Sequence, residues 1–264
     1  RTVDYAKGPS GFIRPDGVEV KEMDEALMEE TLQWYAETAA SARKIGFDSI
    51  FLHFGHGWLP AQFLSPQYNK RTDEYGGSFE NRMRFPLRLV KAVREAVGDN
   101  MAIDFRISQN EYVEGGTTLE DVITFLKAAQ EYIDDANLSG GWIFDPVYVK
   151  YMMPGYPQEL CLNIPRTAIV REQLDIPVTC VGNIPDVKTA EHILAEGKAD
   201  IVAFARNILA DMDLVNKAYR GEEDTIRKAY IEIGKLYYAE RGMAPETAYV
   251  ALCEKITARF PRRA

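Results

Sequence analysis

Apolar residues along the chain recur with two alternating periods. Helical spacing, with apolar positions three or four residues apart, covers residues 23–44, 78–97, 118–132, 165–174 and 186–196. Short runs rich in β-branched and aromatic residues stand beside these segments, at residues 47–53, 101–107, 134–138, 176–181 and 201–204. Helical spacing returns from residue 212 to about residue 260. Strands that alternate with helices predict an α/β protein with a parallel sheet of βα units.

The first predicted strand leads into the most informative stretch of the chain, residues 53–85. It reads HFGHGWLPAQFLSPQYNKRTDEYGGSFENRMRF and holds two of the three histidines, His53 and His56. A polar, glycine-rich loop follows, and a helix is expected to begin near Ser78. Polar residues where a strand meets a loop are the usual place for chemistry in an α/β protein.

This stretch resembles the signature of the Old Yellow Enzyme family of FMN-dependent ene-reductases, in the branch of NADH:flavin oxidoreductases and 2,4-dienoyl-CoA reductases. The resemblance extends over about residues 8–228. It implies a TIM (β/α)8 barrel of the FMN-linked oxidoreductase type, in which the five predicted strands correspond to the fourth to eighth. Residues 1–228 are then a partial barrel, and residues 229–264 a C-terminal helical extension.

Five strands cannot close an eight-stranded barrel, and they leave open sheet edges. The chain begins with Arg1. We therefore expect a fragment that lacks the N-terminal third of the barrel, because about five of the eight βα units are present. The alternative is a complete five-stranded domain. A homo-oligomer, or a partner that supplies the missing strands, would cover the edges.

The resemblance assigns catalytic roles to His53 and His56. The matching pair in the family donates hydrogen bonds to the carbonyl or carboxylate oxygen of an α,β-unsaturated small molecule, which stabilises the charge that grows there during reduction. Without the motif, two nearby histidines would be structural or a weak metal site, and no third ligand is visible. Trp58 departs from the family, which has tyrosine there as the proton donor; indole is not a useful acid near neutral pH. The proton donor therefore stays open.

The resemblance also implies an FMN site. Arg106 matches the arginine that faces the flavin ring, although it could instead pair with a loop carboxylate. Gly182 and Asn183, with Ala205 and Arg206, end the last two strands, where TIM barrels often bind phosphate. The family has glycine in place of Ala205, so the extra methyl group could crowd the phosphate.

Composition limits the classes of partner. The 264 residues carry a net charge of −9 and a pI near 5.0, which argues against nucleic acid or an anionic membrane surface. Cys161, Cys180 and Cys253 show neither metal-ligand nor disulfide spacing, so we expect a cytoplasmic protein without a metal site. An iron–sulfur cluster needs about four thiolates, and none is expected. The sequence has no apolar run of about 18 residues, so no membrane span is predicted.

The favoured function is an FMN-dependent oxidoreductase that uses NAD(P)H to reduce the C=C bond of an α,β-unsaturated carbonyl compound of the enoate or dienoyl-CoA type. The alternative is a degenerate, non-catalytic barrel fragment or subunit that acts in binding or assembly, as Trp58, Ala205 and the missing strands would allow. A TIM-barrel enzyme acting on phosphorylated sugars would explain Gly182 and Arg206 but not residues 53–85. The identity of the substrate, the choice between NADH and NADPH, and the oligomeric state stay open.

Overall fold

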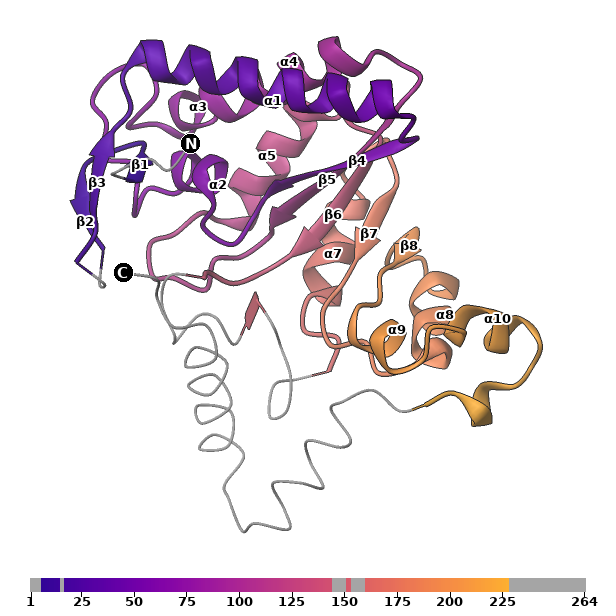
Figure 1. Cartoon of the computed structure of the whole chain (residues 1–264). Helices are drawn as coiled ribbons and strands as arrows, with labels where there is room; N and C mark the ends of the chain where they lie inside the picture. Colours follow the sequence, from indigo (N-terminus) through magenta and orange to yellow (C-terminus); the bar gives the residue numbers. More distant parts are fainter. Residues whose placement is uncertain (1–5, 15–16, 144–150, 153–159, 228–264) are drawn as a thin grey trace.

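The computed structural model describes residues 6–14, 17–143, 151–152 and 160–227. Its centre is a parallel sheet in the order β4-β5-β6-β7-β8, in which each strand pairs with the next along the chain (Figure 1). The strands are Ser49–Phe54, Ala102–Ser108, Asp135–Ser139, Val178–Cys180 and Ile201–Val202. The helices that link them are α4 (Arg84–Val97), α5 (Leu119–Ala129), α7 (Ile164–Arg171) and α8 (Val187–Ala195). This is the succession of five strands and connecting helices that the hydrophobic pattern predicts.

Local capping sets the ends of the helices. Helix α1 (Glu25–Ile45) begins after Asp24, whose side chain accepts a hydrogen bond from the Leu27 N–H at 2.8 Å. It ends at Gly46, whose φ of 101° is left-handed. Helix α5 begins with a capping box between Thr118 and Asp121.

The two faces of the sheet differ in chemistry. On β5, Ile103, Phe105 and Ile107 are at most 2% exposed and belong to the hydrophobic core that the covering helices complete. Alternation along the strand turns Asp104, Arg106 and Ser108 to the opposite, inner face. The register places His53 opposite Arg106, and Arg106 opposite Asn137. The inner face therefore carries polar and charged groups beside one another.

Three short strands at the N-terminal end were not predicted. β1 (Ala6–Gly8), β3 (Glu19–Glu22) and β2 (Phe12–Ile13) form a small separate sheet. Helix α2 (Leu59–Leu64) follows the two histidines, and its first turn contains Pro60. Helix α2 contacts β1, β4 and α4, and the small sheet lies next to the start of α1 (Figure 1).

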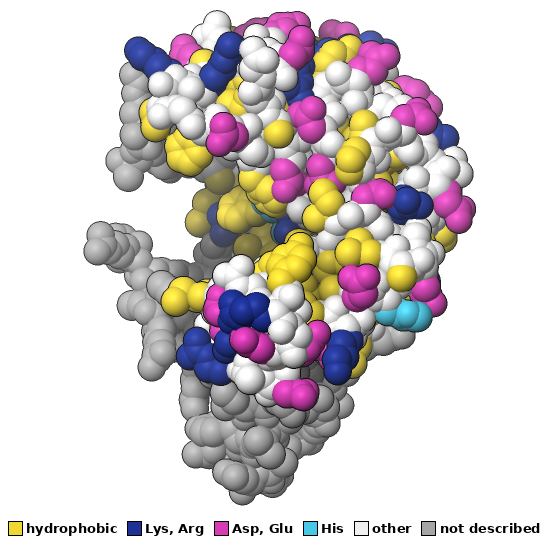
Figure 2. All heavy atoms as spheres, turned by 90° about the vertical axis from the view of Figure 1, so that its right-hand side faces the viewer, with side chains coloured by type: hydrophobic (Ala, Val, Ile, Leu, Met, Phe, Trp, Pro, Cys, Tyr) yellow, Lys and Arg dark blue, Asp and Glu magenta, His cyan; other side chains and the backbone are white. Residues whose placement is uncertain are grey.

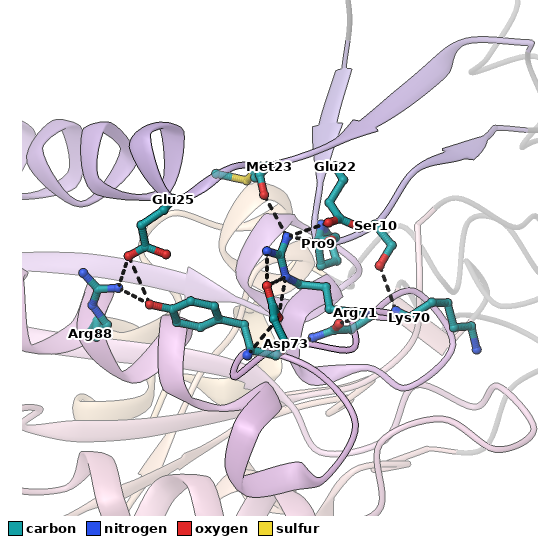
Figure 3. A network of polar contacts seen from close by, with 11 residues as sticks. Pro9, Ser10, Glu22, Met23, Glu25, Lys70, Arg71, Asp73 and Arg88 are labelled. Carbon is teal, nitrogen blue, oxygen red and sulfur yellow. Dashed lines mark hydrogen bonds and ion pairs between the residues drawn. The ribbon is translucent and has the colours of Figure 1, made fainter.

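Arg71 fastens the long loop after β4 to the small sheet (Figure 3). Its Nη1 donates to the carbonyl oxygens of Met23 at 2.8 Å and Pro9 at 3.1 Å, and its guanidinium forms an ion pair with Asp73. The Arg71 side chain is itself buried, so these bonds replace the water that it loses. The sequence analysis gave this loop no catalytic role, and Arg71 has a structural one.

The helix predicted over residues 78–97 is interrupted. It forms α3 (Phe79–Arg82) and α4, with Met83 between them. Arg82 donates from Nε to the Leu64 carbonyl oxygen at 2.8 Å, which ties the short helix to the end of α2. Pro86 has no N–H to donate to the Arg82 carbonyl oxygen, so the helix is interrupted at this point although the apolar spacing is continuous.

The sheet is open at both sides within the described residues, because β4 and β8 each have a single neighbour. Phe51 on β4 is 52% exposed and Ile201 on β8 is 47% exposed. Figure 2 shows the molecule deeply hollowed, with hydrophobic side chains gathered inside the hollow. Apolar side chains such as Phe51 are therefore accessible at the open edge of the sheet, beside the polar groups of its inner face.

The described chain ends with α9 (Arg206–Ala210), α10 (Leu214–Tyr219) and the 3-10 helix η1 (Glu223–Thr225). The predicted helical extension, residues 229–264, lies outside the described residues. Within the described part, no helix combines the length and the apolar character needed to cross a bilayer.

Candidate active site

His53 and His56 lie at the carboxyl end of β4, where the chain leaves the sheet. His56 has a φ of 59°, in the left-handed region that few non-glycine residues adopt. Two bonds hold this turn: the His56 N–H donates to Ser108 Oγ at 2.9 Å, and the Ile143 N–H donates to the His56 carbonyl oxygen at 3.0 Å. Such a conformation persists where the surroundings fix it, and it is frequent at functional sites.

The two imidazole rings face each other. His56 Nδ1 and His53 Nε2 are 3.1 Å apart, with ring centroids separated by 4.9 Å. The other ring nitrogen of His56, Nε2, lies 2.8 Å from Ser139 Oγ. His56 is 6% exposed, whereas His53 is half-buried. Two nitrogen atoms from different residues thus converge on one small region at the mouth of the sheet.

Arg106 lies next to the pair on the neighbouring strand. Its Nη2 donates to Ser139 Oγ at 2.9 Å, so Ser139 connects the guanidinium to His56. Its Nε is buried and has no hydrogen-bond partner among the described residues. The guanidinium carbon lies 5.9 Å from the centre of the Phe51 ring. Arg106 therefore brings a positive charge, with one unused donor, to the inner face.

Electrostatics keep both histidines neutral near pH 7. Burial lowers the pKa of His53 to about 4, and the Arg106 charge lowers it further. Burial also lowers the pKa of His56 to about 3, with smaller effects from Arg106 and His53. A neutral imidazole carries one N–H donor and one acceptor nitrogen, so each ring can donate one hydrogen bond to a ligand.

A buried carboxyl pair lies deeper on the same face. Asp104 and Asp135 are opposite each other in the register, and Thr179 Oγ1 donates to Asp135 Oδ2 at 2.7 Å. Burial raises the pKa of Asp135 to about 7, and Asp104 adds to this effect. Burial raises the pKa of Asp104 as well.

The second predicted group of residues lines a cleft of about 290 Å³ at the ends of β7 and β8. Arg106 and Ser139 lie in the wall of this cleft, together with Gly182, Asn183, Ala205 and Arg206. The structure therefore brings together the predicted cofactor residues, and it joins them to the histidine pair through Ser139.

The backbone at this cleft is closely fitted. Gly182 has a φ of 126°, and a Cβ added there would lie 2.6 Å from Asn163 Nδ2. Asn163 Nδ2 donates to the Val181 carbonyl oxygen at 2.8 Å, and Asn183 has a left-handed φ of 53°. Arg206 Nη2 donates to Asn183 Oδ1 at 3.4 Å. These constraints explain the glycine at position 182 and hold Arg206 at the cleft.

The sequence analysis did not assign Ser139 or Asn163 to the site. Ser139 begins the Ser-Gly-Gly end of the third predicted strand, and that position at a strand end was the available signal. Asn163 stands in a loop, and no local pattern shows that this loop lies beside β7.

Trp58, the departure from the family, is 47% exposed. Trp142 is fully buried, and a Cβ at Gly57 would come 2.6 Å from its ring.

Comparison with known proteins places these residues in a family. The profile of the family described as NADH:flavin oxidoreductase / NADH oxidase matches residues 3–225. The chain is 38% identical over 221 residues to the NADH oxidase of Thermoanaerobacter brockii. The aligned region covers 83% of this chain and 33% of that protein. It is 35% identical over 190 residues to the NADPH dehydrogenase of Clostridium acetobutylicum, which covers 72% and 54% respectively. The chain thus spans about a third and about half of these relatives.

Among solved structures, 2-naphthoyl-CoA reductase in complex with 2-naphthoyl-CoA has a TM-score of 0.80 and 27% identity. The superposition covers 86% of this chain and 34% of that chain. The fold is therefore shared well beyond the motif at residues 53–85. Together with the sheet of five βα units, this likeness confirms the TIM-barrel class predicted from the resemblance.

Proposed function

The chain belongs to the NADH:flavin oxidoreductase / NADH oxidase family, and we propose that it reduces the C=C bond of an α,β-unsaturated carbonyl compound. This family consists of oxidoreductases that work with FMN and NAD(P)H. One observation carries the proposal: two neutral imidazoles converge on one point, beside the half-buried guanidinium of Arg106, at the carboxyl ends of parallel strands. The chain spans only part of its relatives, so the activity of a complete barrel is itself part of this proposal.

The residues present fit FMN. The buried Nε of Arg106, unused among the described residues, suits the carbonyl edge of a flavin, where a fixed cation favours the reduced, anionic form. Arg206 and the backbone of Gly182 and Asn183 suit a phosphate dianion at the other side of the same cleft. Ala205 narrows the phosphate side of the cleft by one methyl group relative to the glycine of the family. When bound, FMN would carry the hydride to the substrate, and NAD(P)H would be the source of that hydride.

The residues of the chain bind and orient the substrate. His53 and His56 donate hydrogen bonds to the carbonyl oxygen and stabilise the negative charge that grows there. Burial excludes water from His56, and a hydrogen bond is electrostatically stronger in such surroundings. Both rings are neutral at pH 7, so they act as N–H donors and leave the positive charge to Arg106.

Trp58 is given no acid role in this proposal. An indole N–H donates hydrogen bonds but does not release its proton near neutral pH. Its half-exposed position suits a side chain that shapes the edge of the substrate site. The proton at the α-carbon then comes from solvent.

Product analysis tests the proposed reaction. Residues 6–227 would be joined behind the N-terminal barrel segment of the Thermoanaerobacter brockii relative, to give a barrel chimera that supplies the missing strands. With FMN, NADH and 2-cyclohexen-1-one under anaerobic conditions, the chimera should form cyclohexanone. A chimera that binds FMN and oxidises NADH, but never forms the saturated ketone, would contradict the proposal.

A second candidate function is that of a non-catalytic subunit. The edges at β4 and β8 favour it, since in the described part of the chain each is open and could pair with another chain. The same chimera separates the two candidates, because a non-catalytic scaffold would show no flavin absorbance after purification and no NADH oxidation.

A further inference from the structure

We propose that Ser139 is a positioning residue that fixes the tautomer of His56, and so makes His56 Nδ1 a permanent donor toward the ligand. Ser139 touches neither the substrate nor the reacting atoms in this proposal. It acts through His56, and its effect on the reaction rests on the function proposed above. The effect on the tautomer itself does not depend on that function.

The direction of the hydrogen bonds follows from Arg106. A guanidinium can only donate, so the bond of 2.9 Å from Arg106 Nη2 occupies a lone pair of Ser139 Oγ. The hydroxyl group has one hydrogen left to place. Within the described part of the chain, the available acceptor is His56 Nε2, at 2.8 Å. Ser139 therefore donates to His56.

The opposite direction is disfavoured. If His56 Nε2 carried the proton and donated to Ser139, the serine would accept two bonds, and its hydrogen would lack an acceptor among the described residues. Ser139 is 2% exposed and His56 is 6% exposed, so bulk water does not supply that acceptor. A buried hydroxyl without an acceptor is costly, and such groups are rare.

The proton of the neutral His56 ring must then lie on Nδ1, which faces His53 Nε2 at 3.1 Å. His53 has no such constraint, because its Nδ1 lacks a partner among the described residues. The pair is thus asymmetric: His56 is a fixed donor, and His53 is adaptable. His53 accepts from His56 in the free site, and it becomes a second donor once its own proton moves to Nε2 and a ligand oxygen arrives.

NMR of 15N-labelled histidine tests the tautomer directly. The chain has three histidines, and His192→Gln removes the signals of the third, which lies on α8. At pH 7, His56 should show a protonated Nδ1 and an unprotonated Nε2, both in the full chain and in the barrel chimera. A protonated Nε2 in wild-type His56 would overturn the proposal without any variant at the site.

Variants identify the serine as the cause. Ser139→Ala should release His56 to a mixture of tautomers or to the Nε2–H form, while Ser139→Thr, which keeps the hydroxyl, should retain Nδ1–H. Ser108→Ala is the matched control, since Ser108 holds the backbone of His56 and not its ring. An unchanged tautomer in folded Ser139→Ala would refute the role of Ser139.

A ligand measurement links the tautomer to the site. In the barrel chimera, Ser139→Ala should weaken binding of 4-hydroxybenzaldehyde by about 10- to 100-fold, the range found when the partner that orients a metal-binding histidine is removed. Ser139→Thr should restore most of the affinity. Equal affinity in all three proteins would contradict the positioning role. If the proposed reaction fails but the tautomer shift is seen, the serine proposal stands and the reaction proposal falls.

Discussion

The charge state of single residues determines what this site can do. His53 and His56 are held neutral by burial and by the nearby guanidinium of Arg106. A protonated pair would place several positive charges within a few ångströms, at a high electrostatic cost in a partly buried site. Neutral rings instead provide N–H donors that need no counter-ion, and this suits an anchor for a carbonyl oxygen.

Removal of either ring should reduce catalysis. His53→Ala or His56→Ala in the barrel chimera should cost about 2–4 kcal/mol of transition-state stabilisation, as loss of an oxyanion donor does. The measurement is kcat/KM for the unsaturated ketone, with His192→Ala on the exposed face of α8 as the control. Unchanged turnover and unchanged phenol binding in the double variant would refute the assigned roles.

The same pKa shifts predict acid sensitivity. The unfolded chain protonates its histidines below about pH 6.5, whereas the folded pKa values are about 4 and about 3. Between these limits the unfolded state binds more protons, so the free energy of unfolding falls as the pH drops from about 6.5 toward 4. Urea denaturation midpoints at several pH values measure this slope, and it should flatten in His53→Gln/His56→Gln. An equally steep slope in that double variant would contradict the assignment.

Asp135 should act in the opposite direction. Its folded pKa of about 7 lies above the unfolded value near 4, so its contribution to stability is lost as the pH rises through 7. Asp135→Asn should therefore raise the denaturation midpoint at pH 8 more than at pH 5. Asp99→Asn, an exposed control, should show no such difference. Equal shifts at both pH values would argue against a buried charge at Asp135.

How far residues could be predicted depended on the range of the interactions that place them. His53, His56 and Arg106 were proposed as site residues because they match the motif of the family and stand at or just past the ends of predicted strands. Ser139 and Asn163 join the site through bonds to residues far away in the sequence, such as Ser139 to His56. No local pattern encodes such a bond, so neither role was predicted.

At the scale of elements, the long parallel strands were the most predictable part. Runs of β-branched and aromatic residues predicted β4 and β5, and their alternation with helical segments predicted a parallel sheet. The strands β1, β2 and β3 have two to four residues each, too few for a period of two to show. The break at Met83 was not predicted either, although Pro86, which cannot donate to the Arg82 carbonyl, is a local signal for it.

The loop after β7 gives a prediction at this scale. Gly182→Ala should weaken FMN binding in the barrel chimera, because the new Cβ would meet Asn163 Nδ2 and displace the wall of the cleft. Gly46→Ala is the matched control: Gly46 also has a positive φ, but a Cβ there meets nothing within 4 Å. Both variants should lose about 1–3 kcal/mol of stability from backbone strain. Flavin fluorescence titration should show weaker binding in Gly182→Ala alone, and equal affinities would contradict a role of this loop in the cofactor site.

At the scale of the whole molecule, the described residues form an unclosed barrel. A groove of about 460 Å³ runs between α1 and β4, lined by Trp34, Tyr35, Ile50 and Phe51 among others. Trp34 is 46% exposed and Phe51 is 52% exposed. Both the open edge of β4 and this groove lie where the next strand and helix of a complete barrel would pack. The open sheet therefore leaves exposed the apolar surface that a closed barrel would bury.

The last prediction follows from these open edges. A flavin held by Arg106, Gly182, Asn183 and Arg206 would keep one side in water, and binding would lose much of its apolar burial. We expect the isolated 264-residue chain to bind FMN weakly or not at all, and to self-associate through its edges. Ile201→Lys on β8 should reduce this association, while Ile13→Lys, exposed on the small sheet, should leave it unchanged. Fluorescence titration with free FMN and sedimentation velocity measure the two properties. A monomeric chain with sub-micromolar affinity for FMN would show that these five strands form a sufficient binding site by themselves.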